Sequence, residues 1–189
     1  MTVAADTFKA IQALLNPKKI QTVTQAVLKV EEKNKAAAMR LIEVVGVGAT
    51  AFSVKYDECG FPGQTLFAPH EELHRGCDSI AFCELEGKPY ILCFELKSSE
   101  PTRHEVAQQF RSASVFLEYL EILLKTYCDS DSIATWPRHY FVFHNQPATP
   151  LSKPTSRDGR DNITPEQALF MAANTGAKIY LRQLLGKAI

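Results

Sequence analysis

The sequence lacks both a net charge and any long hydrophobic run. Lysine plus arginine and aspartate plus glutamate each number 21 among its 189 residues. Proteins that bind nucleic acids through their overall charge carry a basic excess, so binding of that kind would require a local patch. No apolar run approaches the roughly 18 residues that a membrane span needs, and no basic start precedes an apolar stretch at the N-terminus. These absences predict a cytoplasmic protein that does not associate with membranes.

Cysteine is scarce, at five residues, and the number is odd. Cys83 and Cys93 lie inside apolar runs, where a reduced thiol behaves as a small hydrophobic group. We therefore expect a reducing compartment and no disulfide framework.

The composition of 46% hydrophobic and 22% charged residues is that of a protein that buries a substantial core. We expect one domain over residues 1–189. Within it, the core is expected at about residues 35–145, a helical extension at 1–34, and a C-terminal loop and helix at 146–189.

In the N-terminal quarter, apolar residues recur at three- and four-residue spacing, which predicts a helix. They are Ile20, Val23, Val27, Val30, Ala37, Leu41 and Val44. Asn16 and Pro17 form an N-cap pattern, and Gly46 ends the stripe. We expect one long helix or two helices with a break near Asn34, preceded by a short amphipathic helix from Asp6 to Leu15.

The rest of the chain alternates strand and helix patterns. Strands are predicted at 51–56, 79–85, 90–96 and 139–144, a long helix at 101–127, a polar loop at 145–163, a helix starting with a capping-box pattern at 164–167, and an element of undecided type at 178–185. From residue 17 onward the order is helix, three strands, helix, strand. This order predicts an α/β fold with a mixed sheet and helices packed on it.

Three charged residues interrupt the central pair of apolar strands. Asp78 opens the first strand, whereas Glu95 and Lys97 close the second. If Leu85 faces Tyr90 across the turn, then Asp78 faces Lys97, and Glu95 shares their face of the sheet. The three side chains are therefore expected to converge at one end of a hairpin.

Such a cluster suits a metal-dependent reaction. Two neighbouring carboxylates repel each other, and a divalent cation relieves that repulsion. Mg²⁺ prefers oxygen ligands and keeps several waters, and Asp78, Glu95 and the Leu96 carbonyl would leave positions open for them. A metal-bound water is a stronger acid than bulk water, and Lys97 could orient it or stabilise charge on a phosphate oxygen. The pattern thus favours phosphodiester hydrolysis with Mg²⁺ or Mn²⁺.

Asp78, a sixteen-residue spacer and Glu95-Leu96-Lys97 resemble the motif of the PD-(D/E)XK nuclease superfamily, the restriction-endonuclease-like fold. The resemblance implies an αβββαβ core at about residues 35–145 and a DNA or RNA substrate. It also implies that Asp78 and Glu95 bind the metal while Lys97 positions the nucleophile or stabilises the transition state. Cys77 stands where the motif name has proline.

The resemblance also implies auxiliary residues. Many members add a glutamate from the first core helix and a glutamine from the helix after the lysine strand. Glu43 could supply the first, and Gln108 or Gln109 the second. The helix-rich N-terminus and the zero net charge suggest that a homodimer or a partner protein completes the substrate groove.

Other interpretations remain open. The three residues could be a solvent-facing cross-strand pair worth about 0 to 1 kcal/mol, although the apolar run from Tyr90 to Phe94 favours a central strand, where uncompensated charge is costly. His70-Glu71-Glu72-Leu73-His74 matches HExxH, the motif of zinc peptidases, but Pro69 and Gly76 leave it at most two turns of helix. A nuclease fold that binds without turnover is the third alternative.

Some polar residues are better explained without chemistry. Lys153, Arg157 and Arg160 are the best local basic candidate, but such runs are usually solvated loops. His139 and His144 flank an apolar strand and are expected to be satisfied structural histidines.

Overall fold

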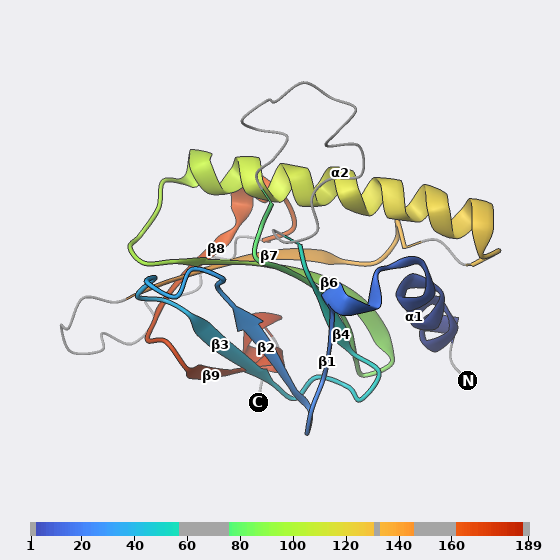
Figure 1. Cartoon of the computed structure of the whole chain (residues 1–189), viewed down its shortest axis with the longest axis horizontal. Helices are drawn as coiled ribbons and strands as arrows, with labels where there is room; N and C mark the ends of the chain where they lie inside the picture. The colour runs from blue at the N-terminus through green and yellow to red at the C-terminus, as the bar shows by residue number, and fades with distance from the viewer. Residues whose placement is uncertain (1–2, 57–75, 131–132, 146–161, 187–189) are drawn as a thin grey trace.

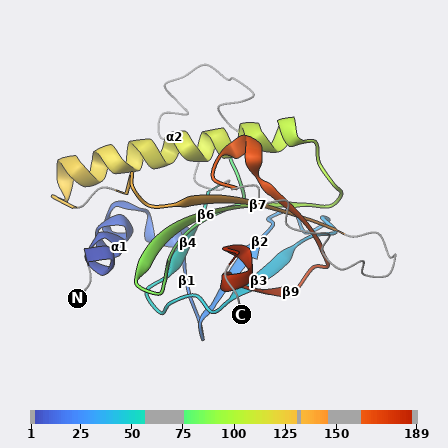
Figure 2. The same ribbon diagram turned by 180° about the vertical axis from the view of Figure 1, so that it is seen from behind.

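The computed structural model describes residues 3–56, 76–130, 133–145 and 162–186 in three layers (Figure 1). The long helix α2 (Arg103–Tyr127) covers one face of a six-stranded sheet. A three-stranded sheet lies on the opposite face, as the reverse view also shows (Figure 2). Among the described residues, no helix is both long and apolar enough to span a membrane.

The larger sheet is mixed, as the sequence predicted. Its strands, in spatial order, are β1 (Ile20–Thr22), β4 (Phe52–Lys55), β5 (Ser79–Leu85), β6 (Lys88–Lys97), β7 (Arg138–Asn145) and β8 (Leu169–Ala173). The first four are antiparallel to their neighbours, whereas β7 runs parallel to β6 and β8 parallel to β7. Helix α2 makes the crossover between β6 and β7, which brings the C-terminal ends of these two strands to the same edge.

Residues 20–45 form strands rather than the predicted helix. Besides β1, this segment contains β2 (Val27–Glu31) and β3 (Leu41–Val45), which pair antiparallel; β9 (Ala177–Tyr180) then adds parallel to β3. Burial alternates along β2 and β3, with Ile42 and Val44 buried beside more exposed neighbours. The period of two and the β-branched residues therefore decide the structure, and the three- and four-residue spacing is coincidental.

Two other predictions also need correction. Residues 164–167 start only a single 3₁₀ turn, η2 (Pro165–Gln167), before β8 begins, and Thr164 makes no side-chain cap. The element of undecided type divides into β9 and a short helix, α3 (Leu181–Leu184). A second 3₁₀ turn, η1 (Pro17–Lys19), follows the Asn16 cap.

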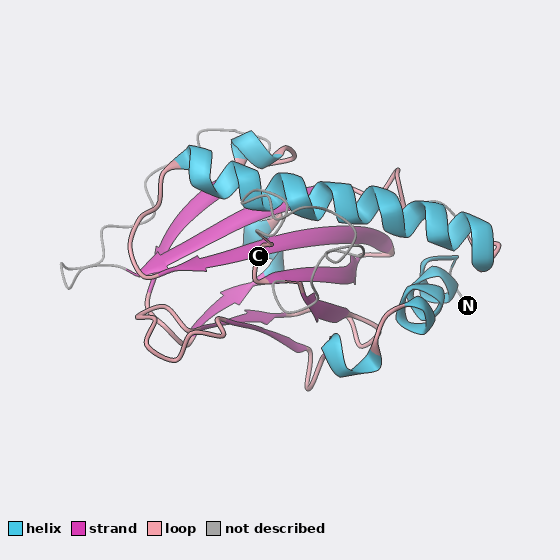
Figure 3. Ribbon diagram, turned by 45° about the horizontal axis from the view of Figure 1, so that its top comes forward, coloured by secondary structure: helices cyan, strands magenta, loops and turns pink. Residues whose placement is uncertain are grey.

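The remaining elements agree with the sequence. Helix α1 (Val3–Leu14) matches the short N-terminal helix, and strands β4 to β7 match the four predicted strands within a few residues. Helix α2 begins at a capping box in which Thr102 and Glu105 bond reciprocally. Figure 3 shows α2 running along the full length of the sheet.

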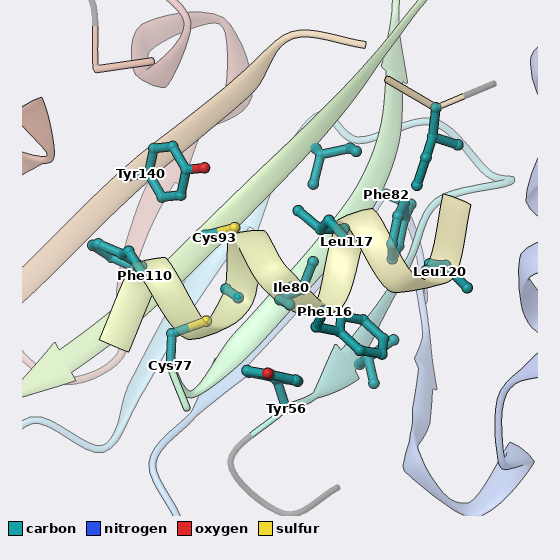
Figure 4. Close-up of a cluster of buried hydrophobic side chains, with 14 of the residues drawn as sticks. Tyr56, Cys77, Ile80, Phe82, Cys93, Phe110, Phe116, Leu117, Leu120 and Tyr140 are labelled. Atoms are coloured by element: carbon teal, nitrogen blue, oxygen red, sulfur yellow. The ribbon is translucent and has the colours of Figure 1, made fainter. Parts of the chain in front are cut away.

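The larger sheet is buried on both faces. Under α2, one core contains Phe110, Leu117 and Tyr140 together with the thiols of Cys77 and Cys93 (Figure 4). A second core fills the space between the two sheets and includes Phe94 stacked on Phe141, with ring centroids 5.6 Å apart. Four cysteines, Cys77, Cys83, Cys93 and Cys128, are free thiols. Strand β6 is thus a central strand, and any charge on it needs compensation.

Candidate functional site

A tight turn sets the register of the β5–β6 hairpin. Glu86 and Gly87 have φ values of 55° and 75°, and Leu85 pairs directly with Lys88. Two left-handed residues form the kind of hairpin turn whose twist matches that of the flanking strands. The predicted pairing of Leu85 with Tyr90 is therefore wrong by two residues.

This shift in register keeps each charged side chain on the predicted face of the sheet but changes the residue that lies opposite it. Ser79 faces Phe94, so the next position places Asp78 opposite Glu95 rather than opposite Lys97. Because side chains alternate with a period of two, all three charged residues still lie on one face. The observed register thus brings the two carboxylates closer together than the predicted one did.

The two carboxylates are interlocked through the backbone. The N–H of Asp78 donates to Oε2 of Glu95 at 3.2 Å, and the N–H of Leu96 donates to Oδ2 of Asp78 at 2.6 Å. Only 6% of Asp78 and 2% of Glu95 is exposed. Both carboxylates therefore lie inside the protein, which rules out the solvent-facing interpretation. Leu96 contacts the pair through its N–H, and the role of its carbonyl as a metal ligand stays a prediction.

Two further side chains converge on Glu95. Lys97 Nζ lies 2.5 Å from Oε1 of Glu95, and Nε2 of Gln109 donates to the same oxygen at 2.7 Å. Gln109 reaches the site from the second turn of α2 and also donates to the Gly76 carbonyl at 3.4 Å. The Lys97 side chain is 31% exposed, so its ammonium group lies between the buried carboxylate and solvent.

Burial raises the pKa of Glu95, whereas Lys97, Gln109 and the Asp78 N–H act in the opposite direction. The protein thus holds a carboxylate in a place where ionisation is unfavourable, and surrounds it with donors that favour the charged form. A carboxyl group whose pKa is perturbed both by burial and by specific charged or polar partners is typical of functional sites.

The structure separates the auxiliary candidates. Gln109 joins the cluster, whereas Gln108, which is also partly buried, contacts His104 at 3.2 Å. Glu43 lies on β3, not on a helix, and its carboxylate is 3.7 Å from Lys178 Nζ. Its neighbours Ile42 and Val44 point into the core between the sheets, so Glu43 points away from the larger sheet and from Asp78.

His144, which was expected to be a satisfied structural histidine, pairs with Lys97 across the parallel β6–β7 ladder. Its neighbour two residues back, Val142, lies in the core under α2, so His144 shares the face of Glu95 and Lys97. Nδ1 of His144 is buried and has no hydrogen-bond partner within the described ranges. His139, by contrast, bonds Asn162 at 2.9 Å, as expected of a structural histidine. The strand-helix-strand order of β6, α2 and β7 could have indicated the position of His144, because such a crossover places the C-terminal ends of the two strands side by side.

Two sequence candidates lie outside the described residues: the HExxH segment at residues 70–74, and the basic run that contains Lys153, Arg157 and Arg160. Across the described part of the chain, no group of three or more histidine, cysteine, aspartate or glutamate side chains could hold a metal ion. The site consists there of two carboxylates, an ammonium group and an amide.

Comparison of the chain with models of protein families, with curated proteins and with solved structures identifies no match.

Proposed function

We propose that the chain is a metal-dependent nuclease of the PD-(D/E)XK type. The observation that carries this proposal is the buried pair of Asp78 and Glu95, with Lys97 and Gln109 both on one oxygen of Glu95. A purely structural ion pair needs one carboxylate and one cation. A second buried carboxylate and an amide from another element suit a site that holds a divalent ion.

The order and pairing of the elements support the proposal. Helix α1 is followed by the antiparallel meander β4-β5-β6, then by α2 and by β7 parallel to β6. If β1, β2 and β3 are treated as insertions, this order is compatible with the αβββαβ order that the resemblance implies, but its first helix then lies at Val3–Leu14, outside the predicted core of about residues 35–145. The first core helix is then α1, which explains why Glu43 does not belong to it.

The donor set fits a hard cation, because Asp78 and Glu95 offer only oxygen atoms. Mg²⁺ or Mn²⁺ bound there would lower the pKa of a coordinated water and stabilise charge on the phosphate. The chain's own groups orient these ligands: Leu96 N–H holds Asp78, and Gln109 holds Glu95. The half-exposed Lys97 can donate to a phosphate oxygen or to the attacking water. DNA and RNA are both suitable substrates for this chemistry.

Replacing Lys97 with alanine is expected to lower the cleavage rate about a hundredfold or more, because one positioned charge is typically worth that much. The substrates would be single- and double-stranded DNA and RNA, each with Mg²⁺ or Mn²⁺. Lys88→Ala is the matched control, since Lys88 is an exposed lysine at the opposite end of the same strand. The substrate that wild type cleaves also identifies the substrate class.

Several outcomes would contradict the proposal. Unchanged cleavage by Lys97→Ala would show that Lys97 has no role in catalysis. Absence of cleavage by wild type on all four substrates would favour a nuclease fold that binds without turnover. Tight Zn²⁺ binding that His70→Ala abolishes would instead favour the zinc peptidase.

A further inference from the structure

The loop between β2 and β3 carries a local basic surface. We call residues 32–40 the basic loop, because Lys33, Lys35 and Arg40 are all exposed. None of these three forms an ion pair within the described residues. The loop also contains Glu32, so its net charge is +2, a local positive excess in a chain of zero net charge.

This loop docks at the C-terminal end of β6, on the face of the larger sheet opposite to the side chains of the candidate site. The N–H of Ala38 donates to Oγ of Ser98 at 3.0 Å, and Ser98 directly follows Lys97. Met39 is fully buried in the core between the two sheets and anchors the loop. The connection from β2 to β3 accordingly lies beside the connection from β6 to α2 (Figure 1 and Figure 3).

Hydrogen bonds hold the loop in one shape. Oδ1 of Asn34 accepts from the N–H of Ala36 at 3.0 Å, and its carbonyl accepts from Ala37 at 2.9 Å. At the other end, Oγ1 of Thr175 accepts from the N–H of Arg40 and of Leu41, each at 3.1 Å. The cations are therefore presented from an ordered backbone, which lowers the entropy that a ligand must remove on binding.

The spacing suits a polyanion that passes through the site. Lys35 lies three residues from Ala38, a span of at most roughly 11 Å of extended chain. One strand of a duplex carries a phosphate about every 3.4 Å along its axis, so this reach corresponds to about three phosphates. A backbone cleaved beside Lys97 would thus meet the basic loop within a few nucleotides.

We propose that the basic loop binds the phosphate backbone of the nucleic acid substrate beside the scissile bond. This inference rests on the proposed nuclease function. Contacts of this kind position the substrate and are independent of its sequence. They also release counterions, so they make the affinity depend on salt.

The test uses Lys33→Gln, Lys35→Gln and Arg40→Gln combined, in a chain that also carries Glu95→Gln to prevent cleavage. Binding of the nucleic acid that wild type cleaves is measured by fluorescence anisotropy across a range of salt concentrations. Each cation contributes about 0.7 to 0.9 to the slope of log affinity against log salt, so the slope should fall by about two to three. Affinity at low salt should fall tenfold or more.

A charge-matched control neutralises three exposed lysines elsewhere, Lys18, Lys29 and Lys88, in the same Glu95→Gln chain. We expect the control to change the slope by less than one. Equal effects of the two triple variants, or no effect of either, would overturn the inference while wild-type cleavage leaves the nuclease proposal standing. If wild type neither cleaves nor binds any nucleic acid, both proposals fail.

Discussion

Replacing Glu95 with glutamine is expected to reduce cleavage on the order of a thousandfold and, at neutral pH, to make the folded protein more stable. Cleavage is expected to fall because an amide binds a divalent cation poorly, so the variant lacks one of the two proposed carboxylate ligands. Stability rises because burial makes ionisation of this side chain unfavourable. The gain in the free energy of unfolding should be about 0.5 to 2 kcal/mol, the size of a typical single stabilising substitution.

The gain should depend on pH in a defined direction. Burial raises the pKa of Glu95 in the folded protein above that of the unfolded chain, so ionisation destabilises the fold. This penalty is absent below the unfolded pKa and reaches its full size as pH rises through the folded pKa. The difference between variant and wild type should therefore vanish in acid and be largest at neutral pH, which urea unfolding at a series of pH values measures.

Glu84→Gln is the control, because Glu84 is a partly exposed carboxylate on the adjoining strand β5. It should leave both cleavage and stability close to wild type. A Glu95→Gln variant that is less stable than wild type at neutral pH, with full cleavage, would identify the cluster as structural.

Replacing Phe110 with alanine is expected to lower the free energy of unfolding by about 3 to 5 kcal/mol. Phe110 is fully buried, and its ring centroid lies 5.2 Å from that of Tyr140 in the core under α2 (Figure 4). The side chain fixes the second turn of the helix on the sheet, and that turn carries Gln109. Cleavage should fall together with stability, because Gln109 loses its fixed position beside Glu95.

The matched control is Val115→Ala on the same helix, at a side chain that is 49% exposed. Chemical denaturation should show a change within about 0.5 kcal/mol, as is usual for surface positions. A loss of less than 1 kcal/mol in Phe110→Ala would contradict the packing described for α2.

The helix and strands nearest the site could be predicted because their patterns have one interpretation. Helix α2 combines a capping box with a long apolar stripe, and β6 is an apolar run ended by charges. The helix predicted for residues 20–45 was wrong because the apolar residues of this segment fit a helical spacing as well as the period of two of a strand. The β-branched residues favour strands over a helix, and so does the pairing of β3 with β9. That pairing joins residues about 135 apart in sequence, so no local sequence pattern could predict it.

The site itself followed from the hairpin, even though the predicted register was wrong. A shift of two residues keeps every side chain on its face, so Asp78, Glu95 and Lys97 still met. The choice between Gln108 and Gln109 depended on the rotation of α2 against the sheet, which tertiary packing decides. The position of the basic loop beside the end of β6 also depends on tertiary packing and could not be predicted. The hydrogen bond from Ala38 to Ser98 joins residues 60 apart in sequence.

The dependence of cleavage on divalent cation tests the central claim most directly. Initial rates would be measured for wild type and Asp78→Asn as Mg²⁺ or Mn²⁺ is titrated from zero, with a chelator in the first sample. The proposed site predicts that wild type is inactive without the metal and saturates as the metal is added, whereas Asp78→Asn stays near the background rate. Cleavage that persists in the chelator, or that Asp78→Asn retains in full, would contradict it.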